Sequence, residues 1–128
     1  MKFHFNPTEG LIIVRAELIG PAASGTAQMA LDTGATRTVV RSALLKAVGY
    51  NVEAAPESVE IATASGIERA PICAVDGIFA LGLDRTALKV LCLDLPPAAE
   101  VDGLLGLDFL RGSVLNIDFR LGRLSLEV

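Results

Sequence analysis

Turn-forming residues interrupt this chain so often that its apolar segments stay short. The segments 11–20 and 26–34 are separated by "PAASG", and "ASG", "VDG" and Pro96-Pro97 break the later part of the chain. Short runs rich in β-branched residues and bounded by turn residues are typical of strands. The regular spacing therefore predicts an all-β fold that closes on itself.

The expected elements are roughly nine strands and two short helices. The first half of the chain is expected to form a hairpin from 11–20 and 26–34 and a strand at 36–40. Three strands within 58–82, with turns at "ASG" and "VDG", and a strand at 87–95 should follow. The last part should form a short strand and a helical turn within 101–112, which Gly112 ends, and a closing hairpin at 113–128. Ser42 is expected to cap a helix over 43–48 that ends at Gly49. No linker or repeat divides the chain, so we expect a single domain over residues 1–128.

The composition excludes several classes of partner. Of the 128 residues, 52% are hydrophobic, and the net charge of −4 with scattered Lys and Arg argues against a nucleic-acid partner. No stretch reaches the roughly 18 apolar residues of a membrane span, and the N-terminal "MKFHFNPTEG" lacks the apolar core of a signal peptide. We therefore expect a cytoplasmic protein without a membrane partner.

Three residues limit the chemistry that the chain can carry. His4 is the only histidine, so a multi-histidine zinc site within one chain is impossible and a Ser-His or Cys-His pair is disfavoured. Cys73 and Cys92 are far apart in the sequence without a Cys-x-x-Cys pattern, which favours two buried thiols. The sequence predicts neither a metal nor a cofactor.

Two motifs carry the functional hypothesis. "ALDTGA" places Asp32 at the end of an apolar segment, and about 70 residues later "VDGLLGLDFL" places two leucines before Gly106. Asp-Thr-Gly alone is an ordinary turn sequence. In this order, with the hairpins between and around them, the two motifs resemble the retropepsin-like aspartic protease family over nearly the whole chain. The resemblance implies a closed all-β barrel with one or two short helices that acts as a homodimer, since only one Asp-Thr-Gly is present.

The family resemblance also implies a reaction and a set of site residues. Two Asp32 carboxylates, one from each protomer, share a proton and activate a water that hydrolyses a peptide bond of a peptide or protein substrate. Thr33 ties the two active-site loops together, and Gly34 allows close approach of the backbone. The substrate-binding residues implied are Ala35, Val39, Ile61, Thr63, Ala64, Ser65, Gly66 and Leu104.

Several positions in the sequence leave alternatives open. The hairpin at 61–70 is expected to act as a flap whose Ile61 and Ile67 face the substrate. Thr36 and Leu107 depart from viral relatives, and Arg37 and Asp108 form either an ion pair near a dimer interface or two separate solvated charges. The alternative functions are a catalytically inactive dimerisation or peptide-binding domain of the same fold and a generic β-barrel carrier.

Overall fold

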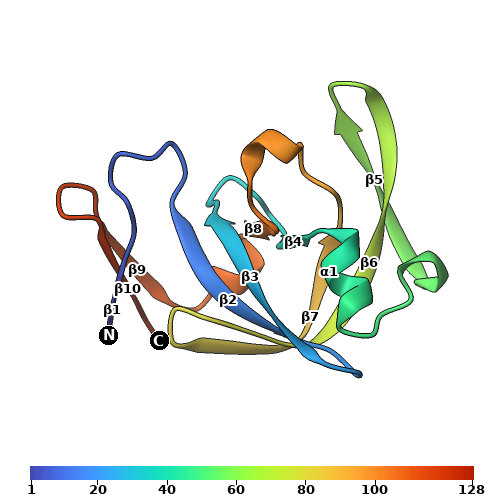
Figure 1. Cartoon of the computed structure of the whole chain (residues 1–128), viewed down its shortest axis with the longest axis horizontal. Coiled ribbons are helices and arrows are strands. Elements are labelled where there is room, and N and C mark those ends of the chain that lie inside the picture. Colours follow the sequence, from blue (N-terminus) through green and yellow to red (C-terminus); the bar gives the residue numbers. More distant parts are fainter.

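The computed structural model describes residues 1–62 and 64–128, and six of its strands close into a barrel (Figure 1). Around the barrel the strands are β2 (Ile13–Ile19), β3 (Ser24–Leu31), β8 (Gly103–Leu105), β4 (Val39–Val40), β7 (Leu83–Cys92) and β6 (Gly66–Ala80), which pairs with β2 again. Strand β5 (Glu57–Thr63) pairs only with β6, and the two form a hairpin that projects beyond the barrel. The prediction of a closed all-β barrel is confirmed.

Alternating apolar residues on the strands fill the barrel interior. On β2, Val14, Ala16 and Leu18 are buried while the residues between them are more exposed, as expected for a strand with one face on a core. The side chains buried most completely come from strands and helices alike; they include Met29, Leu45, Val75, Val90, Leu105 and Phe109. The core thus holds the ends of β3 and β8 rigidly, and the two candidate motifs lie at those ends.

The chain termini form a second, three-stranded sheet beside the barrel. Its order is β1 (Lys2–His4), β10 (Arg123–Glu127) and β9 (Val114–Asp118), and both pairings are antiparallel. Leu124 of β10 is buried against the barrel core, and the two chain ends lie near each other in Figure 1. The predicted closing hairpin is confirmed, with its turn ending at Gly122.

The short helices lie close to where they are expected, but the predicted cap is wrong. Helix α1 spans Ser42–Ala47 and is followed by Gly49 at φ 111°, a conformation that favours glycine. Its N-cap residue is Arg41, and the Ser42 N–H donates instead to Asp94 Oδ1 at 2.9 Å. Helix α2 spans Leu107–Leu110, and two 3-10 turns, η1 (Val52–Ala54) and η2 (Pro97–Ala99), complete the elements.

The turn expected at "VDG" does not exist, and the structure has ten strands rather than nine. Strand β6 runs without a break through Asp76 and Gly77, and its turn to β7 comes later, at Leu81 and Gly82. Gly77 lies within the strand because it pairs with Ile19 of β2 on one side and with Thr86 of β7 on the other. Strand β4 is also shorter than the predicted 36–40. No helix in the described part of the chain is long and apolar enough to cross a membrane.

Candidate active site

Strand β8 lies between β3 and β4 and brings the two sequence motifs together. Leu104 pairs with Ala30 of β3 in parallel and with Val39 of β4 in antiparallel orientation. Gly103 is required for this fit, because a Cβ there would lie 1.9 Å from the Val39 carbonyl oxygen. The chain therefore leaves β3 at Asp32, loops around the end of β8 and returns as β4.

Backbone hydrogen bonds hold the half-buried Asp32 in this loop. Its N–H donates to the Leu105 carbonyl at 2.9 Å, which continues the β3–β8 pairing by one residue. The Gly34 N–H donates to Asp32 Oδ1 at 2.9 Å and the Ala35 N–H to the Asp32 carbonyl at 3.2 Å. The carboxylate is thus oriented by the turn that follows it.

The second motif crosses directly over the Asp32 loop. The Leu107 N–H donates to the Ala35 carbonyl at 2.8 Å, and the Asp108 N–H donates to Thr36 at 3.3 Å. A Cβ on Gly106 would lie 2.8 Å from the Ala35 carbonyl oxygen, so only glycine permits this contact. The Leu-Leu-Gly segment therefore supports the Asp-Thr-Gly loop through these contacts, and the two motifs form one structural unit.

The Arg37–Asp108 ion pair considered from the sequence is absent, and Asp108 is not a solvated surface charge. Its Oδ1 accepts hydrogen bonds from the Thr38 N–H at 2.9 Å and the Thr38 hydroxyl at 2.7 Å. Thr38 is fully buried, and its hydroxyl oxygen also accepts the Gly106 N–H at 3.2 Å. Asp108 therefore satisfies buried donors of the Asp32 loop and makes no ion pair with Arg37.

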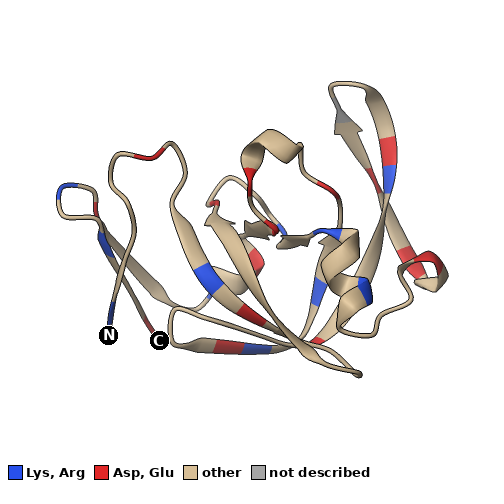
Figure 2. Ribbon diagram, in the orientation of Figure 1, with Lys and Arg blue, Asp and Glu red and all other residues tan. Residues whose placement is uncertain are grey.

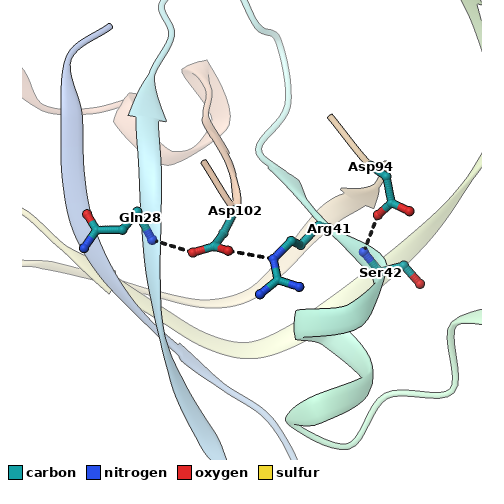
Figure 3. A network of polar contacts seen from close by, with 5 residues as sticks. All are labelled: Gln28, Arg41, Ser42, Asp94 and Asp102. Carbon is teal, nitrogen blue, oxygen red and sulfur yellow. Dashed lines mark hydrogen bonds and ion pairs between the residues drawn. The ribbon is translucent and has the colours of Figure 1, made fainter. Parts of the chain in front are cut away.

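A second polar network ties the same strands together below the loop (Figure 3). Asp102, just before β8, accepts the Gln28 N–H of β3 at 2.8 Å through one oxygen and Arg41 Nε at 2.6 Å through the other. Burial by itself would raise the pKa of Asp102, but the two hydrogen bonds and the charge of Arg41 outweigh it and lower the pKa. This arrangement fixes β3, β8 and the start of α1 relative to one another.

The strand register places an apolar floor beside Asp32. Paired residues point to the same face of a sheet, so Ala30, Leu104 and Val39 lie on one face. Side chains alternate along a strand, so Asp32, two residues after Ala30, is on the same side. The pairing continues through Leu91 of β7 to Ile72 of β6. We call Ala30, Val39, Ile72, Leu91 and Leu104 the apolar floor. Its buried members Ala30, Val39 and Ile72 lie outside the barrel core cluster.

Sequence reasoning found Val39 and Leu104 of this floor and missed the others. Leu91 and Ile72 lie on strands that are distant from both motifs in the sequence. The sequence feature that could have indicated them is the alternation of side chains along the strand segments 70–73 and 88–92. This alternation does not show which residues face the barrel interior and which face outward.

The hairpin expected to be a flap is present between β5 and β6. Ala64, Ser65 and Gly66 are exposed, and Gly66 has φ +122°; the predicted substrate-binding residue Thr63 lies outside the described residues. The expectation that Ile61 and Ile67 face the same way is wrong. Ile61 pairs with Glu68 and Ile67 with Ala62, so the two isoleucines lie on opposite faces of the hairpin, and Ile67 is 74% exposed.

The remaining predicted residues lie as follows. Thr33 is exposed and makes no hydrogen bond with the described residues, so its hydroxyl is accessible at the surface of the loop. Cys73 and Cys92 are buried free thiols, as predicted, and burial raises the pKa of both. His4 is exposed on β1. Among the described residues, no three His, Cys, Asp or Glu side chains cluster in a way that would hold a metal ion.

A cavity of about 430 Å³ lies away from the predicted site residues. Its lining comes from the terminal strand β1, the outer part of β2 and the β6–β7 turn, and includes Phe3, Ile13, Phe79 and Leu81. It therefore belongs to the junction between the terminal sheet and the barrel, and not to the Asp32 loop.

Comparison with known proteins agrees with this geometry. Residues 23–112, which include both motifs and the flap hairpin, match the family described as "gag-polyprotein putative aspartyl protease". The crystal structure of a retropepsin-like aspartic protease from Rickettsia conorii superposes with a TM-score of 0.74 at 19% sequence identity, over 99% of this chain and 91% of that one. No curated protein matches the chain significantly in sequence. The chain belongs to the gag-polyprotein type of aspartyl protease family and has a retropepsin-like fold.

Proposed function

We propose that the protein is an aspartic endopeptidase whose active site forms between two copies of the chain. One observation carries the proposal: the Asp32 carboxylate lies on a loop that β8 holds through the Asp32 N–H···Leu105 bond, while the Gly34 N–H binds its Oδ1. The Asp32–Gly34 bond alone is an ordinary Asx turn, but the long-range bond to Leu105 fixes this turn to β8 and beside the apolar floor. Family membership and the likeness to the Rickettsia fold support the same conclusion.

The proposed chemistry requires two carboxylates close enough to share one proton. The ionised carboxylate takes a proton from a water, whose oxygen attacks the peptide carbonyl carbon, while the protonated one donates its proton to the carbonyl oxygen. The tetrahedral intermediate then collapses, the C–N bond breaks, and the amine leaves with a proton returned from the pair. The products are a free carboxyl group and a free amine, so no other reactant is consumed.

A single chain supplies one acid in an Asp-Thr-Gly loop, so the proposal requires a homodimer with Asp32 next to its two-fold axis. The exposed Thr33 supports this arrangement, because its side chain is accessible to the same loop of a second chain. The substrate would be an extended peptide that lies on the apolar floor, under the β5–β6 flap. We therefore expect apolar residues next to the bond that is cleaved.

The test is cleavage of a diverse peptide mixture by the wild-type protein and by Asp32→Asn, with products identified by mass spectrometry. Asp32→Asn keeps the size of the side chain and should abolish cleavage while thermal unfolding stays close to that of the wild type. The matched control is Asp84→Asn, because Asp84 is exposed on β7 and its side chain makes no hydrogen bond or ion pair with the described residues. Near-normal cleavage by Asp32→Asn would contradict the proposal. Peptide binding by a wild-type protein that cleaves nothing would favour the inactive peptide-binding domain.

A further inference from the structure

Arg37 is a charged side chain beside the candidate active site for which the fold provides no partner. It lies in the bend that joins the Asp32 turn to Val39 of the apolar floor, and its backbone packs against Gly106. The side chain is half-buried, and its Nη1 is shielded from solvent without any hydrogen-bond acceptor among the described residues. We propose that Arg37 determines specificity by binding the side-chain carboxylate of an acidic residue in the substrate peptide; this inference rests on the function proposed above.

The other half-buried arginines have acceptors: Arg41 pairs with Asp102, and Arg85 donates to backbone carbonyls at the end of α2. The remaining arginines are exposed, so Arg37 is the exception among the half-buried ones that the structure describes. Charged residues of both signs are scattered over the whole fold (Figure 2), so partners are plentiful elsewhere. The lack of an acceptor for the Arg37 guanidinium is therefore specific to the Asp32 loop.

The acids that neighbour Arg37 in the sequence and across the loop do not neutralise it. Asp108 directs the same oxygen to both donors of Thr38, and Asp32 accepts the Gly34 N–H. Neither forms an ion pair with Arg37. A charged guanidinium that is partly enclosed without an acceptor costs free energy. An anionic group from outside the chain that binds the solvent-accessible part of this half-buried side chain would offset the charge.

A carboxylate is the acceptor that fits best. The guanidinium presents several N–H donors in one plane, which match the two oxygens of a carboxylate, and partial enclosure strengthens the contact by excluding water. Arg37 is two residues before Val39, and its backbone packs against Gly106, two residues after Leu104, so our proposal places a peptide seated on the floor beside it. One acidic residue within a few positions of the cleaved bond should therefore favour cleavage over its amide by about 10-fold to 100-fold.

The first experiment identifies the preferred position. A peptide library with blocked termini, so that only side chains carry carboxylates, is digested by the wild-type protein and the cleavage sites are aligned. We expect enrichment of Asp or Glu at one fixed position near the cleaved bond. Peptide pairs that differ only by Glu or Gln at this position then give the ratio of kcat/KM. A ratio near one would overturn the proposal.

Substitutions of Arg37 connect the preference to this side chain. Arg37→Gln should reduce the Glu-to-Gln ratio to near one, and Arg37→Glu should favour Lys at the same position. Arg37→Lys keeps the charge without the planar fork and should retain part of the ratio; it also serves if Arg37→Gln unfolds. The matched control is Arg120→Gln, in the exposed β9–β10 turn, which changes the net charge equally and should leave the ratio unchanged.

Two outcomes separate this inference from the proposed function. If the wild-type protein cleaves nothing, the same peptide pairs are tested for binding by fluorescence anisotropy; preferential binding of the Glu peptide that Arg37→Gln loses would support the inference although the protease proposal fails. If Arg37→Gln lowers cleavage of both peptides equally and weakens self-association in sedimentation experiments, Arg37 binds a second copy of the chain instead. That result would overturn the specificity assignment.

Discussion

The Asp108 carboxylate accepts hydrogen bonds from both the backbone N–H and the hydroxyl of the fully buried Thr38, at 2.9 and 2.7 Å. Asp108 follows the Leu-Leu-Gly motif, and Thr38 follows the Asp-Thr-Gly motif. The pair therefore joins two segments that are 70 residues apart in the sequence. The integrity of the Asp32 loop depends on this contact as well as on strand pairing.

Replacing Asp108 tests that contact. Asp108→Ala leaves two buried donors of Thr38 without an acceptor, and we expect the free energy of unfolding to fall by about 2–4 kcal/mol. Asp108→Asn retains one acceptor oxygen and should cost less. The measurement is urea unfolding followed by circular dichroism. Asp84→Ala is the surface control and should stay within about 0.5 kcal/mol of the wild type; an equally small effect for Asp108→Ala would contradict the role assigned to the pair.

The lowered pKa of Asp102 predicts a pH dependence of stability. The folded protein binds a proton on Asp102 less readily than the unfolded chain, whose aspartate pKa is about 3.9. The stabilisation from Asp102 is therefore complete above that value and is lost as the pH falls through it toward the lower folded pKa. We expect Asp102→Asn to be less stable than the wild type at pH 6, and the difference to shrink between about pH 5 and 3. A difference that stays constant over this range would show that the charge of Asp102 is not what stabilises the fold.

Arg85 on β7 should be important for the position of helix α2. Its Nε donates to the Phe109 carbonyl at 2.9 Å, another of its nitrogens donates to the Arg111 carbonyl, and its guanidinium carbon lies 6.0 Å from the centre of the Phe109 ring. Arg85→Met keeps an apolar stem but removes these bonds, so the free energy of unfolding should fall by about 1–3 kcal/mol. The melting temperature should fall accordingly. Arg85→Lys should be intermediate. Unchanged melting of Arg85→Met would mean that the helix end is held by packing alone.

The flap tip offers a test that separates function from global stability. Gly66 adopts φ +122°, where a Cβ is strained, although the space around it is open. Gly66→Ala should therefore distort the turn and weaken peptide binding, while the barrel unfolds almost as in the wild type. Gly10→Ala, at a site that also has open space but no positive φ, is the control. Affinity for a peptide-like inhibitor of aspartic proteases gives the comparison; equal affinities for the two variants would argue against a flap at residue 66.

The sequence was sufficient to predict the barrel and the closing hairpin because these depend on local patterns, whereas the pairing of the two motifs in one site was implied only by the family resemblance. Apolar segments between turns define strands, and Gly103 and Gly106 permit the close crossing at β8. The false turn at "VDG" shows the limit of this reasoning. Gly77 lies inside a strand that pairs with β2, and this pairing exists only because the barrel closes. A local pattern cannot show it.

Partners of side chains were the least predictable part of the site. Arg37 and Asp108 have opposite charges, but the donors of Thr38 occupy Asp108, and such competition appears only when distant segments are packed together. Likewise, Ile61 and Ile67 are six residues apart across a turn, and only the register that pairs Ala62 with Ile67 and Ile61 with Glu68 places the two isoleucines on opposite faces.

The most direct measurement of the central claim, one active site built from two Asp32 residues, is a subunit-mixing experiment. Wild-type protein at fixed concentration is equilibrated with increasing Asp32→Asn protein, and peptide cleavage per wild-type chain is recorded. If the site requires an acid from each chain, a nine-fold excess of Asp32→Asn should lower this activity to about one-tenth by mass action, since most wild-type chains then have an inactive partner. The same nine-fold excess of Asp84→Asn protein should cause no loss of cleavage per wild-type chain. Activity per wild-type chain that does not change with added Asp32→Asn, under conditions where subunits exchange, would contradict the shared site.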